Sequence, residues 1–228
     1  MPIFITLFHS ACSEASLCIY QYPTSRVRGS DTMSEPSLYD DIPCRYFHKP
    51  GGKNTKAVLE AVSRRAKELS IGKVLIATCS GRTAFEAVKV FDKDIRIIAV
   101  THVTGYAKPN FQELDEKDRR ELEGHGITVL TCQHAFGGVG RGVRNKLATY
   151  QLDEIMAYTL RIFGQGVKVA IELALMAADA GLVRTDEDII SVGGTARGVD
   201  SALVLKPANS SYVFDLKVKE VICKPAAF

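Results

Sequence analysis

Short β-branched or apolar segments alternate with longer helical patterns from residue 44 to residue 223 of this 228-residue chain. The clearest of them, residues 73–78, is an almost unbroken apolar run, which is typical of a central strand covered on both faces. Strands and helices in regular alternation indicate βαβ units and a mostly parallel sheet. We therefore predict an α/β fold, a three-layer α/β/α sandwich whose mostly parallel sheet carries an antiparallel edge strand.

The pattern also suggests how the chain is divided. Residues 1–40 are rich in serine and carry no such alternation, so we expect a disordered tail or a mis-assigned start upstream of Met33, and a single domain over residues 41–228. Gly164 and Gly166 predict a kink or a loop between two helices. We expect strands at 44–48, 73–78, 95–101, 127–131, 188–192, 202–206 and 218–223, and helices at 54–69, 82–91, 113–123, 153–163 and 167–180.

Charge and composition exclude several classes of function. The 29 basic and 26 acidic residues leave a net charge of +3, and no basic run is interleaved with aromatics, so we do not expect a nucleic-acid partner. The longest strongly apolar stretch, residues 167–182, is too short to span a bilayer comfortably. The six cysteines form no C-x-x-C pair, which favours a reducing cytoplasm. A homo-oligomer formed through apolar helices remains open.

The sharpest local feature is the segment Thr78–Ala84, where a buried strand passes into a helix. Free N–H groups of a first helical turn, the hydroxyls of Ser80 and Thr83 and the guanidinium of Arg82 would suit a phosphate oxygen. An equally simple alternative is that a hydroxyl caps the helix while Arg82 pairs with a surface carboxylate.

Three further turns after predicted strands are also rich in small polar residues. Parallel strands bring such turns to one edge of the sheet, where open α/β folds bind ligands. Tyr106 and Phe136 would stack on a planar ring or pack against the sheet. We expect cofactor-binding residues in all four turns: Ser80, Gly81, Arg82, Thr83, Thr101, His102, Thr104, Gly105, Tyr106, His134, Phe136, Gly138, Arg141, Gly193, Gly194, Thr195 and Arg197.

Catalytic residues are less well defined by the sequence. His102 and His134 follow strands and are candidate general acids or bases, although a histidine in such a turn is more often a hydrogen-bonded structural residue. Cys79 and Cys132 are candidate nucleophiles, but burial as small apolar side chains explains them as well. No paired carboxylates and no metal-ligand cluster stand out, so we predict no metal site.

The segment from Lys73 through Ala84, followed by the strand around Ile97, resembles the C-terminal α/β domain of pyruvate kinase. Residues 188–194 lie where that domain has its last glycine-bearing loop, and the whole stretch from 44 to 224 is similar to standalone archaeal and bacterial proteins of this type. In pyruvate kinases the S-G-R-[ST] turn cradles an effector sugar phosphate. In the standalone relatives the same edge is associated with bound flavin mononucleotide (FMN).

The resemblance implies that the chain binds a phosphorylated small molecule, FMN, with Ser80, Gly81, Arg82 and Thr83 as phosphate ligands. The catalytic lysine and metal carboxylates of pyruvate kinase belong to a separate barrel domain and have no counterpart here, so we expect no pyruvate kinase activity. If the chain binds FMN, one function that we expect for it is that of a flavin-dependent oxidoreductase. The alternatives are a sugar-phosphate-sensing module without chemistry of its own and a hydrolase or lyase that uses Cys79 or His134.

Overall fold

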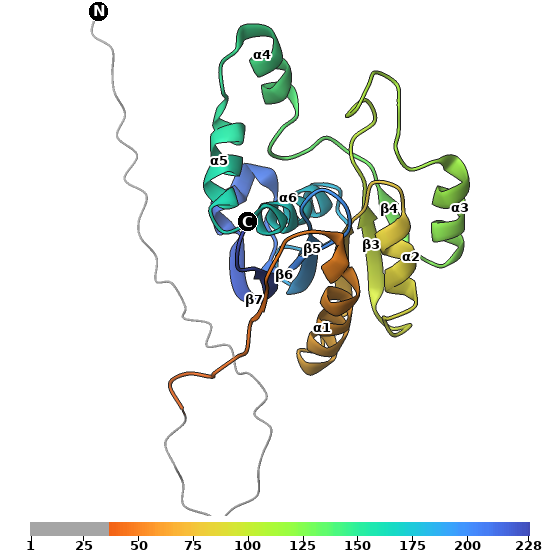
Figure 1. Cartoon of the computed structure of the whole chain (residues 1–228), viewed down its shortest axis with the longest axis vertical. Coiled ribbons are helices and arrows are strands. Elements are labelled where there is room, and N and C mark those ends of the chain that lie inside the picture. The colour runs from red at the N-terminus through yellow and green to blue at the C-terminus, as the bar shows by residue number, and fades with distance from the viewer. Residues whose placement is uncertain (1–36) are drawn as a thin grey trace, which may run out of the picture. The chain divides into compact units, whose positions relative to one another are not determined.

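The computed structural model describes residues 37–228 (Figure 1). The expected tail, residues 1–40, and the alternative start at Met33 therefore lie almost entirely outside the described residues. No described helix is both long and apolar enough to cross a membrane.

The described residues contain one seven-stranded sheet in the order β1-β7-β6-β5-β2-β3-β4. β6 runs antiparallel to both of its neighbours, and every other pair is parallel. All seven predicted strands are present, and the predicted fold class is confirmed; β7 and β1 continue the sheet beyond the antiparallel strand. The strands are β1 (Arg45–Phe47), β2 (Lys73–Ala77), β3 (Arg96–Val100), β4 (Thr128–Leu130), β5 (Ile189–Gly193), β6 (Ser201–Lys206) and β7 (Lys217–Pro225).

Two hydrophobic cores, one on each face of the sheet, produce the three layers. Along β2, Val74 and Ile76 point into the core shared with α1 (Thr55–Glu68) and α2 (Arg82–Val88), whereas Leu75 points into the core shared with α6 (Gln165–Asp179). This alternation is the two-residue period of a strand. Because both faces of the sheet are covered, β2 needs apolar residues on both sides, and after Lys73 its sequence supplies them at every position.

Helix ends depart from the sequence prediction for local reasons. α3 (Glu116–Gly124) begins later than expected because the Asp115 side chain caps it, accepting a hydrogen bond from the Asp118 N–H at 2.7 Å. Gly166, predicted to lie in a kink or a loop, lies inside α6. A side chain there would approach the Asp200 carboxylate to 2.4 Å, so this glycine permits close packing of the helix on the sheet.

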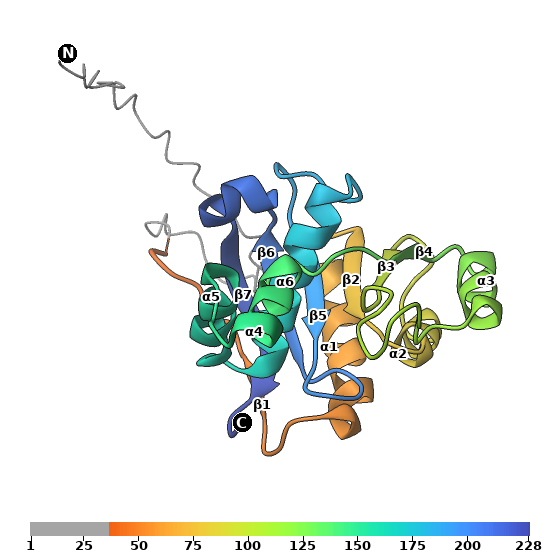
Figure 2. The ribbon, with the colours of Figure 1, turned by 90° about the horizontal axis from the view of Figure 1, so that it is seen from above.

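One helix was not predicted. α4 (Val139–Leu147) occupies part of a segment that we expected to be a loop, and none of its residues is buried. Its two internal glycines, Gly140 and Gly142, weaken the helical pattern in the sequence. α4 packs on α5 (Leu152–Arg161), which in turn packs beside α6 (Figure 2). Two short 3-10 helices, Gly52–Asn54 and Ser210–Asp215, complete the domain.

Candidate functional site

The loops that follow β2, β3 and β4 converge at the carboxyl edge of the sheet, as the sequence predicts. The Cys79 sulfur lies 3.6 Å from both ring nitrogens of His102. The Tyr106 ring stacks on His102, with ring centres 4.0 Å apart, and on His134, with ring centres 5.3 Å apart. Thr101 shares a 2.7 Å hydrogen bond with Thr131. Three turns that are distant in sequence therefore form one surface.

The Ser80 turn does not have the arrangement in which a hydroxyl caps the helix and Arg82 pairs with a surface carboxylate. Gly81, not a hydroxyl residue, is the N-cap of α2, with a φ of +80° that favours glycine, and no side chain caps the helix. Within residues 37–228, Arg82 has no carboxylate partner and the Ser80 hydroxyl has no hydrogen-bond partner. Both side chains are exposed, whereas Thr83 is buried. Arg82 and Ser80 are thus available to an anion.

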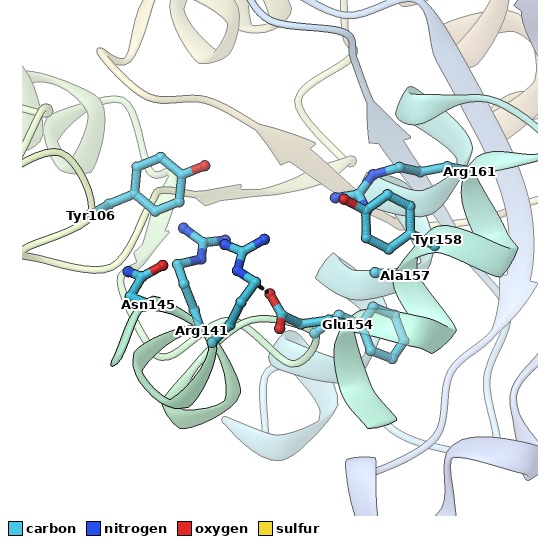
Figure 3. Close-up of a pocket in the computed structure, with 9 residues that line it drawn as sticks. Tyr106, Arg141, Asn145, Glu154, Ala157, Tyr158 and Arg161 are labelled. Atoms are coloured by element: carbon cyan, nitrogen blue, oxygen red, sulfur yellow. Dashed lines mark ion pairs between the residues drawn. The ribbon is translucent and has the colours of Figure 1, made fainter. Parts of the chain in front are cut away.

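A cavity of about 400 Å³ opens beside Tyr106, and we call it the arginine cavity. Figure 3 shows Tyr106 on one side of it and Tyr158 and Arg161 on the other, with Arg141 and Glu154 between them. The Arg141 guanidinium lies 4.7 Å from the centre of the Tyr106 ring, within the range of a cation–π contact. The full lining is Tyr106, Phe136, Arg141, Arg144, Asn145, Glu154, Ala157, Tyr158 and Arg161.

The arginine cavity carries an excess of positive charge. Glu154 is the sole carboxylate in its lining and pairs with Arg144, whose Nε lies 3.2 Å from the Glu154 Oε1. Arg161 donates to the neutral Gln165 side chain at 2.7 Å, and Arg141 has no carboxylate partner among the described residues. Since Arg141 and Arg161 are not neutralised, the cavity suits an anionic or electron-rich group.

A buried ion pair supports the floor of this site. Lys168 and Glu172, one turn apart on α6, form an ion pair although each is at most 5% exposed. Glu172 also accepts a 2.9 Å hydrogen bond from the Phe136 N–H, which ties the loop after β4 to α6. Burial lowers the pKa of Lys168, against the opposing effect of Glu172. The pair therefore holds Phe136 in place below the arginine cavity.

The fourth predicted turn, after β5, has a different explanation. Side chains at Gly193 and Gly194 would come within 2.1 Å of the carbonyl oxygens of Gly166 and Gly198, so close backbone packing accounts for both glycines. Thr195 donates its N–H to the buried Asp200 carboxylate at 3.1 Å. This turn does not line the arginine cavity, and Arg197 is exposed.

Other predicted residues lie around the site without lining the arginine cavity. Thr104 and Gly105 are exposed in the loop after β3, where the Gly105 N–H donates to the Phe111 carbonyl at 2.9 Å. At Gly138 a side chain would collide with Gln133. The sequence analysis missed Arg144, Glu154, Tyr158 and Arg161. The sequence did contain a signal for Arg144, because its three-residue spacing from Arg141 places both side chains on one face of a helix.

His134 and Cys79 are not ready acid–base or nucleophilic groups. The Val103 N–H donates to His134 Nε2 at 3.3 Å, which requires that nitrogen to be unprotonated. Burial lowers the pKa of His134 to about 4, so its ring is neutral at neutral pH. Burial raises the pKa of the Cys79 thiol to about 11, and a protonated thiol is a weak nucleophile. These states favour binding over catalysis by the two residues.

Acidification should destabilise the domain through His134. Its pKa is about 4 when folded against an ordinary 6.5, so between these values the unfolded chain binds the additional proton. Unfolding therefore becomes easier as the pH falls through this window, by about 2 kcal/mol from this residue. Urea denaturation of the wild type and of His134→Gln, in EDTA, measures the effect. Equal losses of stability in both proteins would contradict it.

Comparison with known families adds one finding. The model of the family described as "Pyruvate kinase, alpha/beta domain" matches residues 56–205, which is more than half of the chain. The matched segment runs from α1 to β6. It includes the Ser80 turn, the aromatic cluster formed by the stacked rings of His102, Tyr106 and His134, and the helices that form the arginine cavity.

Proposed function

The chain belongs to the pyruvate kinase alpha/beta domain family, and from that premise we propose that it binds a phosphorylated small molecule, FMN, at the carboxyl edge of its sheet. The observation that carries the proposal is the arginine cavity, in which guanidinium groups without a carboxylate partner among the described residues lie beside an aromatic ring. Such a combination suits a ligand that is both planar and electron-rich or anionic.

In this proposal the two ends of FMN occupy two neighbouring parts of the edge. The phosphate binds the Ser80 turn, where Arg82 and Ser80 have no side-chain partners within residues 37–228. The isoalloxazine ring lies against Tyr106 in the arginine cavity, and Arg141 and Arg161 face its electron-rich carbonyl edge. His102 lies between the two parts, because it contacts Cys79 on one side and stacks on Tyr106 on the other. A bound flavin would make redox chemistry available to the site.

A sugar-phosphate sensor is the second candidate, favoured by the same excess of arginines. A sugar bisphosphate would place one phosphate on the Ser80 turn and the other in the arginine cavity. The two candidates differ in their need for an aromatic partner, since a sugar has no planar ring to stack.

Tyr106→Ala separates these two ligands. The substitution should weaken FMN binding about tenfold through loss of ring stacking and leave the affinity for a sugar bisphosphate almost unchanged. Quenching of flavin fluorescence measures the first, and competition against bound FMN or calorimetry measures the second. Tyr212→Ala, also an exposed tyrosine but outside the arginine cavity, is the control. Undiminished FMN affinity in Tyr106→Ala would contradict the placement of the ring.

The remaining expectations concern location and partners. The described cysteines Cys44, Cys79, Cys132 and Cys223 are all free thiols, which fits the cytoplasm as the place of action. α5 exposes Leu152 and Ile155, and Ile162 directly after it is exposed as well, which gives an apolar surface that a homo-oligomer would cover. We propose neither a nucleic-acid nor a membrane partner.

A further inference from the structure

Three potential metal ligands from separate segments meet beside the aromatic cluster. Cys79 follows β2, His102 follows β3, and Glu113 lies in the loop before α3. The sulfur, a ring nitrogen and a carboxylate oxygen all lie within 4.8 Å of one another. His102 Nδ1 and Glu113 Oε2 are 2.5 Å apart, and both side chains are about 30% exposed. The group is thus enclosed but open to ions from solvent.

We propose that Cys79, His102 and Glu113 bind a divalent transition metal ion, with Zn²⁺ the best match. Thiolate, imidazole and carboxylate are the three ligand types that zinc takes in proteins, and the thiolate disfavours Mg²⁺ and Ca²⁺. Three protein ligands leave a fourth position for water or for an atom of a bound molecule, which is the arrangement of a catalytic zinc site.

Two of the distances between ligand atoms can be compared with those required around a metal ion. Bond lengths of about 2.3 Å to sulfur and 2.0 Å to nitrogen at a tetrahedral angle place those two atoms roughly 3.5 Å apart. The Cys79 sulfur lies 3.6 Å from the His102 ring nitrogens. For a metal ion to enter, the Glu113 carboxylate oxygen would have to move away from His102 Nδ1 by roughly 1 Å. A half-exposed glutamate in a loop can make that movement.

The surroundings hold the ligands in position. Tyr106 stacks on the His102 ring, and the Gln112 side chain donates to the His102 carbonyl at 3.0 Å. Leu114, next to Glu113, is buried at 2% exposure and anchors the loop. The sequence alone does not reveal the group because its members are far apart along the chain and Glu113 reads as the first residue of a helix.

This metal site does not depend on flavin binding, and its test uses a different signal. The full-length protein is treated with EDTA, dialysed, and titrated with Co²⁺, which substitutes for Zn²⁺ and is coloured. We expect one equivalent per chain, a thiolate-to-cobalt charge-transfer band in the near ultraviolet, and loss of the band when Zn²⁺ is added. Cys79→Ser should abolish the band, whereas Cys132→Ser, which also changes a half-buried cysteine after a strand, should retain it.

A second variant tests the metal site even if Cys79→Ser does not fold. Glu113→Gln removes a half-exposed carboxylate and should weaken Co²⁺ binding by at least about tenfold while the circular dichroism spectrum is unchanged. An unaltered charge-transfer band in Cys79→Ser, or the absence of stoichiometric Co²⁺ binding to the wild type, would overturn the proposal and leave the three residues as a hydrogen-bonded group.

Discussion

Lys168→Met is expected to lower the free energy of unfolding by about 3–5 kcal/mol, because it leaves the Glu172 carboxylate buried without a countercharge. Both side chains are almost fully enclosed, so water cannot replace the lost partner. Methionine fits the space of a lysine stem, which keeps the effect of changed volume small. Urea denaturation at neutral pH measures the change.

Two matched variants show whether the buried charge is the cause. Lys168→Met combined with Glu172→Gln removes the charge and keeps an acceptor for the Phe136 N–H, so it should recover more than half of the lost stability. Lys56→Met breaks a pair of the same i,i+4 spacing with Glu60, but on the exposed face of α1, and should change stability little. If Lys168→Met alone were as stable as Lys168→Met combined with Glu172→Gln, the buried charge would not be the cause of the lost stability.

Arg82→Ala combined with Ser80→Ala is expected to weaken FMN binding by about 2–4 kcal/mol, from loss of one charge-assisted and one neutral hydrogen bond to the phosphate. Both side chains are exposed and have no partners in the part of the chain that the structure describes, so the folded state should be almost unaffected. The same variant should leave the affinity for riboflavin, which lacks the phosphate, unchanged. Fluorescence titration with both ligands measures the difference.

Arg120→Ala on α3 is the control, because it removes another exposed arginine of the same domain. Equal weakening of FMN and riboflavin in the double variant would show that the turn acts on something other than the phosphate. Unchanged FMN affinity would remove the Ser80 turn from the proposed site and leave the arginine cavity as the place for the phosphate.

The sequence predicts the sheet well because its signals are local. In β2 every residue after Lys73 is apolar, and turn residues bound each strand, so the seven strands are recognised within one or two residues of their ends. The convergence of the loops after β2, β3 and β4 also follows from the parallel order alone. These features depend on period and polarity, which can be counted along the chain.

The rest of the site depends on packing that no local pattern encodes. α4 is glycine-rich and fully on the surface, so its sequence resembles a loop, and the cavity that it forms with α5 was therefore missed. Gly193 and Gly194 suggested the approach of a ligand, whereas the structure supplies another part of the backbone as the close neighbour. The grouping of Cys79, His102 and Glu113 likewise exists only once the chain has folded.

An absorbance spectrum of the purified protein in the near-ultraviolet and blue region, recorded after gel filtration with added FMN, tests the central claim most directly. The account predicts flavin bands that travel with the protein and that are lost in the Arg82→Ala, Ser80→Ala variant. A colourless protein that passes through the column without retaining FMN would contradict flavin binding and favour a sugar-phosphate sensor.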